Sequence, residues 1–178
     1  MIPIILTGRR LISCPAGYSG LTTCTKCDIG YFASAAGSTS CKPCPTGTGR
    51  YAYAQTSCDP CPAGFSNNAI GSYCKKCDIG YFASATGSKI CLPCPVGTGR
   101  YAYTQKTCDP CPAGFSNNAI GSYCKKCDIG YFASGTGSTS CTPCPVGTGS
   151  YAYAQKTCDP CPAGFSNNAI GSYCKKTT

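Results

Sequence analysis

The chain has 178 residues, of which 20 are cysteine, and it contains neither histidine nor tryptophan. Ile, Leu, Val and Phe together make up about 13% of it, below the rough 20% under which chains tend to stay disordered. A compact domain of this length needs a sizeable aliphatic core, so the composition excludes an ordinary globular domain. Fifteen Lys and Arg oppose six acids, all of them aspartate, which gives a formal net charge of +9.

Cysteine is the obvious substitute for the missing aliphatic core. At this density a chain is typically a disulfide scaffold made in an oxidising compartment. The composition therefore predicts an extracellular protein, secreted or on the cell surface.

Residues 1–13, MIPIILTGRRLIS, stand outside the pattern of the rest of the chain. They lack the charged start and the long apolar stretch of a secretion signal, so they are either a signal remnant or part of the working protein. In the second case, the β-prone stretch 2–7 could add as a donor strand to the open sheet edge of a neighbouring subunit. Its apolar side chains are our first candidates for self-association: Ile2, Ile4, Ile5 and Leu6.

From residue 14 onward the chain is a tandem repeat. A truncated unit covers 14–26, and three copies of 50 residues follow at 27–76, 77–126 and 127–178, the last with a C-terminal cap. The string CDIGYFAS begins at 27 and recurs at a period of 50, as does CDPCPAGFSNNAIGSYCKK from 58. A fixed period of this size indicates an array of stacked repeats.

Each copy contains a shorter pattern in which CxxC pairs recur after 17, 17 and 16 residues. Strings such as Cys44-Pro45-Thr46-Gly47 place Pro and Gly at the second and fourth positions of a type I turn. Aromatic or alternating residues follow each turn, and no stretch has helical periodicity. We expect small disulfide-rich β/loop repeats, arranged as an elongated array of stacked mini-hairpins with arms of about 3–5 residues and essentially no helix.

Repeat symmetry restricts the disulfide pairing, because near-identical copies should bond equivalent cysteines equivalently. Joining the second cysteine of each CxxC to the first of the next meets this condition and leaves no free thiol, whereas interlaced groups of four do not. An adjacent-then-crossed pattern also fits six cysteines per copy and stays open. In the first scheme the cysteines pair in this order: Cys14–Cys24, Cys27–Cys41, Cys44–Cys58, Cys61–Cys74, Cys77–Cys91, Cys94–Cys108, Cys111–Cys124, Cys127–Cys141, Cys144–Cys158 and Cys161–Cys174.

Other chemistry finds little support in the motifs. The CxxC spacing is close to that of four-cysteine zinc sites, but three pairs per copy cannot form two-pair sites without breaking the repeat symmetry. No histidine, close carboxylate pair, nucleophile elbow or phosphate loop is present. Each aspartate follows a cysteine and is expected to cap a turn. We therefore predict no metal, no cofactor and no enzymatic activity.

The repeated aromatic and basic residues are the candidates for binding. If the Tyr-Ala-Tyr strings are strands, both rings point to one face, where they either pack over a disulfide or form a contact stripe. Lysine pairs such as Lys75-Lys76 also recur, and they either keep the array soluble or bind an acidic polysaccharide. Nucleic acid and a transmembrane segment are not expected, and O-linked sugars are left open. The tyrosine candidates for self-association are Tyr51, Tyr53, Tyr101, Tyr103, Tyr151 and Tyr153.

The string CPAGFSNNAIGSYCKKC resembles the ephrin-receptor-like and tumour-necrosis-receptor-like cysteine-rich modules of extracellular proteins, over residues 14–176. The long tandem of nearly identical CxxC repeats is also similar to the immobilisation (surface) antigens of ciliates. That second resemblance implies an extracellular coat protein without catalysis, usually anchored by a lipid. The gaps between CxxC pairs are shorter than in those antigens.

These observations predict an extracellular structural protein whose disulfide-stapled repeats build a surface coat or filament by self-association, head to tail or laterally. The alternative is a receptor-like or adhesin ectodomain that binds a protein or an acidic polysaccharide along its side. Uniformity of the copies distinguishes the two, because a specific ligand site should make one copy differ from the others.

Overall fold

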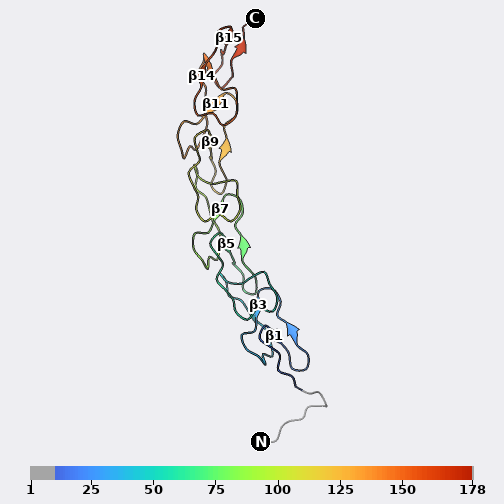
Figure 1. Cartoon of the computed structure of the whole chain (residues 1–178). Coiled ribbons are helices and arrows are strands. Elements are labelled where there is room, and N and C mark those ends of the chain that lie inside the picture. The colour runs from blue at the N-terminus through green and yellow to red at the C-terminus, as the bar shows by residue number, and fades with distance from the viewer. Residues whose placement is uncertain (1–10, 178) are drawn as a thin grey trace. The chain divides into compact units, whose positions relative to one another are not determined.

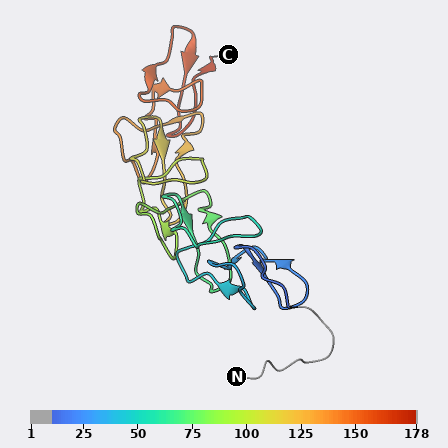
Figure 2. The same ribbon diagram turned by 60° about the horizontal axis from the view of Figure 1, so that its bottom comes forward.

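The computed structural model describes residues 11–177, and these fall into two units. The first consists of the described part of Met1–Lys76 together with Ser84–Ile90, and the second of Cys77–Ala83 together with the described part of Cys91–Thr178. Each unit contains a succession of small hairpins in chain order (Figures 1 and 2).

Eight antiparallel hairpins make up the regular structure, and residues 11–177 contain no helix. This confirms the predicted class of disulfide-rich mini-hairpins. Three hairpins belong to the first unit: β1 (Tyr18–Ser19) with β2 (Thr25–Lys26), β3 (Tyr31–Phe32) with β4 (Lys42–Pro43), and β5 (Phe65–Ser66) with β6 (Lys75–Lys76). Five belong to the second: β7 (Tyr81–Phe82) with β8 (Leu92–Pro93), β9 (Phe115–Ser116) with β10 (Lys125–Lys126), β11 (Tyr131–Phe132) with β12 (Thr142–Pro143), β13 (Thr148–Gly149) with β14 (Asp159–Pro160), and β15 (Phe165–Ser166) with β16 (Lys175–Lys176).

The turn that opens each hairpin differs from the predicted one. The amide of Thr48 donates to the carbonyl of Pro45 at 3.2 Å, so the turn begins at the proline and not at the cysteine before it. Gly47 then occupies the third position with φ of 79°, the conformation that a type II turn requires there. The expected type I turn was therefore wrong, because the proline starts the turn one residue later and the glycine supplies its positive φ.

The hairpin arms are also shorter than expected, with two residues each instead of 3–5. The arms end early because their backbone groups bond to later parts of the unit: the amide of Ala33, directly after β3, donates to the carbonyl of Gln55 at 3.0 Å. The returning strand is most often the middle of a CxxC motif, as in β4 between Cys41 and Cys44. The two sulfurs of one CxxC belong to different loops, because Cys41 bonds back to Cys27 and Cys44 bonds forward to Cys58.

Ten disulfides join the cysteines, and no cysteine is free. Each bridge closes one hairpin loop over a sequence separation of 10 to 14 residues, in the order Cys14–Cys24, Cys27–Cys41 and so on to Cys161–Cys174. In the chain-entropy model a loop of about 15 residues is stabilised by roughly 3 kcal/mol.

Sulfur forms the core of both units. The largest fully buried side chains are all cysteines: Cys14, Cys27, Cys44 and Cys61 in the first unit, and Cys77, Cys94, Cys111, Cys127 and Cys144 in the second. The other buried apolar residues are Cys174 and alanines such as Ala33 and Ala133, which directly follow the Tyr-Phe strands. The disulfides thus occupy the place of the aliphatic core that the composition lacks.

Backbone hydrogen bonds link successive hairpins within a unit. The amide of Cys111 donates to the carbonyl of Gly97 at 2.8 Å, and the amide of Gly137 donates to the carbonyl of Cys111 at 2.7 Å. The turns also approach closely, since a Cβ atom added to Gly97 would lie 2.4 Å from the carbonyl oxygen of Gly137. Each hairpin is therefore held by those that follow it, as in other repeat arrays.

Candidate interaction surface

The cysteines offer no reactive or metal-binding chemistry in this structure, because all twenty are in disulfides. Within residues 11–177 no group of three or more Cys, His, Asp or Glu side chains could hold a metal ion. Their function is structural, and the remaining candidates are on the surface.

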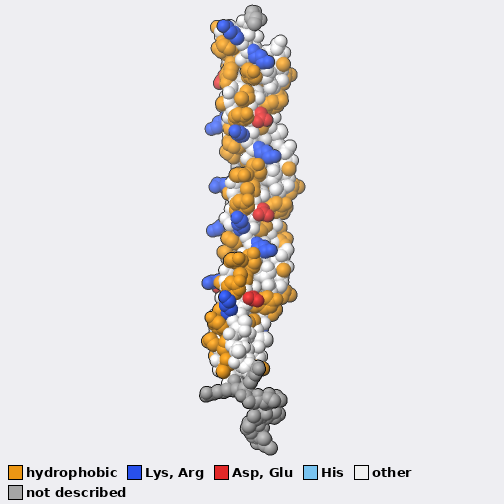
Figure 3. Space-filling view, turned by 90° about the vertical axis from the view of Figure 1, so that its right-hand side faces the viewer, with side chains coloured by type: hydrophobic (Ala, Val, Ile, Leu, Met, Phe, Trp, Pro, Cys, Tyr) orange, Lys and Arg blue, Asp and Glu red, His pale blue; other side chains and the backbone are white. Residues whose placement is uncertain are grey.

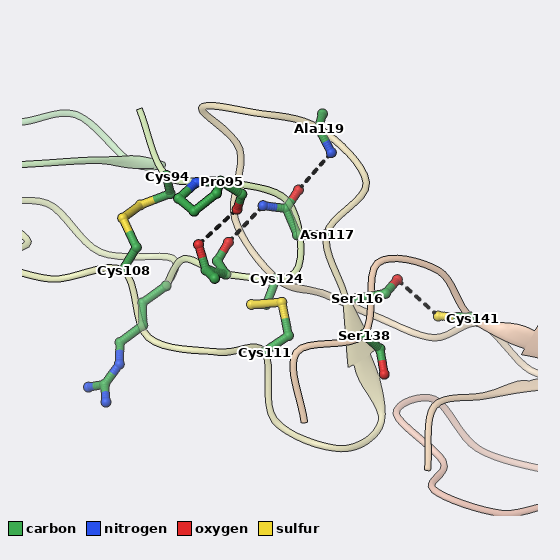
Figure 4. Close-up of a disulfide and its surroundings, with 12 residues drawn as sticks. Cys94, Pro95, Cys108, Cys111, Ser116, Asn117, Ala119, Cys124, Ser138 and Cys141 are labelled. Atoms are coloured by element: carbon green, nitrogen blue, oxygen red, sulfur yellow. Dashed lines mark hydrogen bonds between the residues drawn. A yellow bond between two sulfur atoms is a disulfide. The ribbon is translucent and has the colours of Figure 1, made fainter. Parts of the chain in front are cut away.

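Buried asparagines hold the loops beside the disulfides. The amide of Asn117 donates to the carbonyl of Thr98 at 2.7 Å, and its side-chain oxygen accepts from the amide of Ala119 at 3.1 Å. Figure 4 shows this side chain close to the Cys94–Cys108 and Cys111–Cys124 bridges. Asn67 and Asn167 make the equivalent bonds in the other copies. These asparagine hydrogen bonds therefore join loops that are distant in the sequence, and the sequence analysis did not predict them.

The Tyr-Ala-Tyr strings are not strands, and this corrects the premise of a flat stripe with both rings on one face. After Tyr51 and Tyr53 the backbone turns sharply at Ala54, whose φ is 54°. The Gln55 carboxamide fixes the bend: its oxygen accepts from the amide of Arg50 at 3.2 Å, and its nitrogen donates to the carbonyls of Arg50 and Ala52 at 3.1 and 3.0 Å. Gln105 makes the same three bonds in the second copy.

The bend separates the two tyrosines and gives each a different partner. Tyr51 meets Tyr73 edge to face, with ring centroids 4.8 Å apart, whereas the ammonium of Lys26 lies 4.2 Å from the centroid of Tyr53. The second unit contains both contacts as well: Tyr101 with Tyr123 at 4.8 Å, and Lys126 over Tyr153 at 4.0 Å. Lysine–ring and edge-to-face ring contacts of this kind are stabilising and still leave the tyrosines accessible.

The predicted tyrosine candidates are all on the surface. Tyr51 and Tyr101 are 73% and 72% exposed, and Tyr151 is 50% exposed. Hydrophobic side chains lie next to Lys and Arg side chains along the face seen in Figure 3.

Two aspartates of the CDPC motifs make ion pairs with arginine. Asp59 pairs with Arg50, and Asp109 pairs with Arg100. The expected role as turn caps is therefore incomplete for these residues, because their carboxylates face the arginine that precedes Tyr-Ala-Tyr. The Asp59 carboxylate also accepts from the Ser57 hydroxyl at 3.2 Å. Both ion pairs are solvent-exposed, so each contributes little to stability.

The third copy departs from the other two, because Ser150 replaces the arginine. The Ser150 side chain is buried, and its hydroxyl accepts from the amide of Gly130 at 2.8 Å. Gln155 is less buried than Gln55 and Gln105, and no hydrogen bond of its side chain repeats their bonds within residues 11–177. In this copy β13 pairs with β14 as a hairpin with two residues in each arm, whereas the earlier copies have a single bridge at the equivalent place.

A polar groove of about 620 Å³ lies in the second unit. The side chains of Lys125, Lys126, Asp128 and Tyr131 line it together with the Ser116 hydroxyl, which lies 3.2 Å from the sulfur of Cys141 (Figure 4). One of the repeated lysine pairs thus borders a hollow, which sequence reasoning did not predict.

The other predicted candidates, Ile2, Ile4, Ile5 and Leu6, lie outside the described residues. Among residues 11–177, no helix is long and apolar enough to cross a membrane.

The chain matches the family model described as tyrosine-protein kinase ephrin type A/B receptor-like. It covers residues 15–54, 80–123 and 130–176, which is well over half of the chain. The chain belongs to the ephrin-receptor-like repeat family. The search of curated proteins finds no match to the chain.

Family membership agrees with the disulfide-rich hairpins and confirms the resemblance to receptor-like cysteine-rich repeats. These repeats are non-catalytic modules of extracellular, receptor-like ectodomains. An extracellular location also agrees with ten disulfides, which persist in oxidising environments. The ephrin-receptor-like repeats therefore indicate an extracellular, receptor-like ectodomain.

Proposed function

We propose that this chain is an extracellular structural protein whose repeats associate with further copies to form a surface coat or filament. The observation that carries the proposal is the exposure of the same tyrosines in every copy, since Tyr51, Tyr101 and Tyr151 are all at least half exposed. Aromatic residues are enriched in protein interfaces, and the same exposed ring recurs in each of the three copies.

Charge determines how this association depends on salt. The chain has a formal net charge of +9, and lysines contact Tyr53, Tyr73, Tyr123 and Tyr153. Two such surfaces repel each other at low ionic strength, and salt screens this repulsion. Self-association through tyrosines should therefore strengthen as the salt concentration rises.

A second candidate is an adhesin-like or receptor-like ectodomain that binds an acidic polysaccharide. It is favoured by the polar groove lined by Lys125 and Lys126 and by the excess of basic residues. Binding to a polyanion weakens with salt, because the attraction is screened. The two candidates thus predict opposite responses to the same variable.

The test uses the oxidised full chain in analytical ultracentrifugation and electron microscopy between low and high salt. Self-association predicts larger species or filaments as salt rises, and their loss when Tyr51, Tyr101 and Tyr151 are replaced by serine. The second candidate would be favoured if the chain is monomeric at every salt concentration and is retained on immobilised heparin less strongly as salt rises. Lys125→Ala/Lys126→Ala should then reduce the retention.

A further inference from the structure

The third copy has a cleft of about 340 Å³ between the side chains of Ile129, Tyr151 and Tyr173. All three side chains are partly exposed, with Ile129 at 37% and Tyr151 and Tyr173 near one half. The cleft is lined by two rings and an aliphatic side chain, the kind of lining found in grooves that take up apolar or proline-containing peptide segments.

In the earlier copies the equivalent tyrosines are packed against each other. The rings of Tyr101 and Tyr123 meet edge to face with centroids 4.8 Å apart, as do those of Tyr51 and Tyr73. No such ring contact joins Tyr151 to Tyr173 in the described part of the chain. The third copy therefore has separated rings where its two predecessors have a closed pair.

Ser150 accounts for this difference. An arginine at this position must keep its charged end in water, and Arg50 and Arg100 do so while their backbones bond to Gln55 and Gln105. The small side chain of Ser150 is buried instead, and its hydroxyl accepts a hydrogen bond from the Gly130 amide. The backbone directly before Tyr151 is therefore held by a contact that an arginine with a solvated charged end does not make.

The same substitution removes the cation from Asp159. Asp59 and Asp109 each face the arginine of their own copy, but the third copy has Ser150 there, and no ion pair forms at Asp159 within residues 11–177. An exposed carboxylate without its cation thus lies in the same copy as the open cleft. A ligand that suits both features has an apolar stretch and an arginine.

The chain itself contains a segment of this kind. Residues 2–6 read Ile-Pro-Ile-Ile-Leu, and Arg9 and Arg10 follow after two further residues. An apolar, proline-containing stretch suits the tyrosine cleft, and the arginines complement the carboxylate of Asp159.

We propose that the cleft of Ile129, Tyr151 and Tyr173 receives residues 2–6 of a second copy of this chain, with Arg9 or Arg10 of that copy pairing with Asp159. This inference rests on the proposed function of self-association, and it makes the contact head to tail. Because the donor segment and the acceptor cleft are different surfaces of the chain, the contact is heterologous and repeats from chain to chain, which gives a filament, or a ring where the rotation closes.

The first test measures binding of a fluorescently labelled peptide of residues 1–10 to the oxidised full chain by anisotropy. Tyr173→Ser should weaken binding at least tenfold, and Ser150→Arg should do the same by restoring the arginine of the other copies. Tyr123→Ser is the matched control, because it removes the equivalent ring of the second copy and should leave the affinity unchanged. Asp159→Asn should weaken binding at low salt only. Equal binding by the unmodified chain and by Tyr173→Ser would overturn the proposal.

A second measurement separates this inference from the proposed function. Excess unlabelled peptide and the Tyr173→Ser substitution should each convert assemblies of the full chain into monomers, as measured by ultracentrifugation. Assemblies that persist in both cases would overturn the head-to-tail joint and leave self-association standing. The chain could instead be monomeric at every concentration in sedimentation and still bind the peptide through Tyr173. That result would support the peptide-binding cleft and contradict assembly into a coat or filament.

Discussion

Apart from Ser84–Ile90 of the second copy, the second and third copies lie in the same unit. They share most of their sequence, yet their surfaces differ. In the second copy Arg100 faces Asp109, Gln105 holds the bend, and the Tyr101 and Tyr123 rings are in contact. In the third copy the serine at the equivalent position is buried, and the equivalent rings are apart. The disulfides and the buried asparagines are the same in both copies.

The comparison shows that the core and the surface of a copy are determined separately. The core depends on cysteines and on backbone contacts that every copy repeats, so it tolerates the change at position 150. The surface depends on one arginine and one glutamine, so a single substitution rearranges it. Copies that look uniform in sequence can therefore differ where they meet a partner.

The largest expected effect concerns the core, where the two copies should behave alike. Replacing Cys94 and Cys108 by alanine should lower the free energy of unfolding by roughly 3 kcal/mol, because the bridge closes a loop of about 15 residues. Replacing Cys144 and Cys158 should cost about the same, since that loop has equal length. Guanidinium denaturation of both variants measures the losses. A markedly smaller loss in the third copy would contradict the equivalence of the two cores.

A glycine pair should separate the copies next. Gly97 and Gly147 hold the same turn position, with φ of 73° and 80°. A Cβ atom at Gly97 would lie 2.4 Å from a backbone oxygen, whereas one at Gly147 meets nothing within 4 Å. Gly147→Ala should cost about 1–2 kcal/mol from the backbone conformation alone, and Gly97→Ala should cost about 1 kcal/mol more.

Thermal unfolding of the two oxidised glycine variants gives the comparison. The sign of the difference is what matters, because both variants have the same strained backbone. Equal losses would mean that the close approach of the second and third copies contributes nothing to stability.

A smaller difference is expected at the glutamines. Gln105→Ala leaves the backbone groups of Arg100 and Ala102 without their partners and should cost about 1–3 kcal/mol. Gln155→Ala should stay within about 0.5 kcal/mol, because Gln155 does not make the equivalent bonds within the described residues. Denaturant titrations would show the difference, and hydrogen exchange at the Arg100 amide should rise only in Gln105→Ala. A large loss in Gln155→Ala would contradict the described bend.

The hairpins could be predicted from the sequence because the cysteine spacing is a local pattern, and the same spacing recurs in each 50-residue copy. The sequence also has serine at position 150, where the other two copies have arginine. It did not predict the bend at Tyr51 and Tyr53, because that bend depends on Gln55, whose carboxamide has no distinctive spacing. The same holds for Asn117, which bonds across 19 residues to Thr98.

Errors in the local geometry have a common physical origin. The turn type was wrong because the proline and glycine pattern fits two registers, and only the positive φ of Gly47 distinguishes them. The arms were expected to be longer because alternation continues beyond Phe32, but the next amide, that of Ala33, bonds to Gln55 and not to the partner strand. Bonds between hairpins decide both features, and such bonds leave no pattern in a single repeat.

The smallest expected effect is at the aspartates, and it tests the charge difference between the copies. Asp109→Asn removes an exposed ion pair with Arg100 and should cost about 0.2–1 kcal/mol. Asn keeps an oxygen that can accept from the Thr107 hydroxyl, so the change is confined to charge. Asp159→Asn should not change the free energy of unfolding of the monomeric chain, because Ser150 provides no cation.

Paired denaturant curves at low and high salt measure this effect. The difference between the two variants should disappear at high salt, since the ion pair is screened there. A salt-dependent loss in Asp159→Asn would mean that this carboxylate has a cationic partner in its own copy. The arginine of a second copy would then have no unpaired carboxylate to meet, and the electrostatic half of the head-to-tail joint would fail even if the apolar segment still entered the cleft.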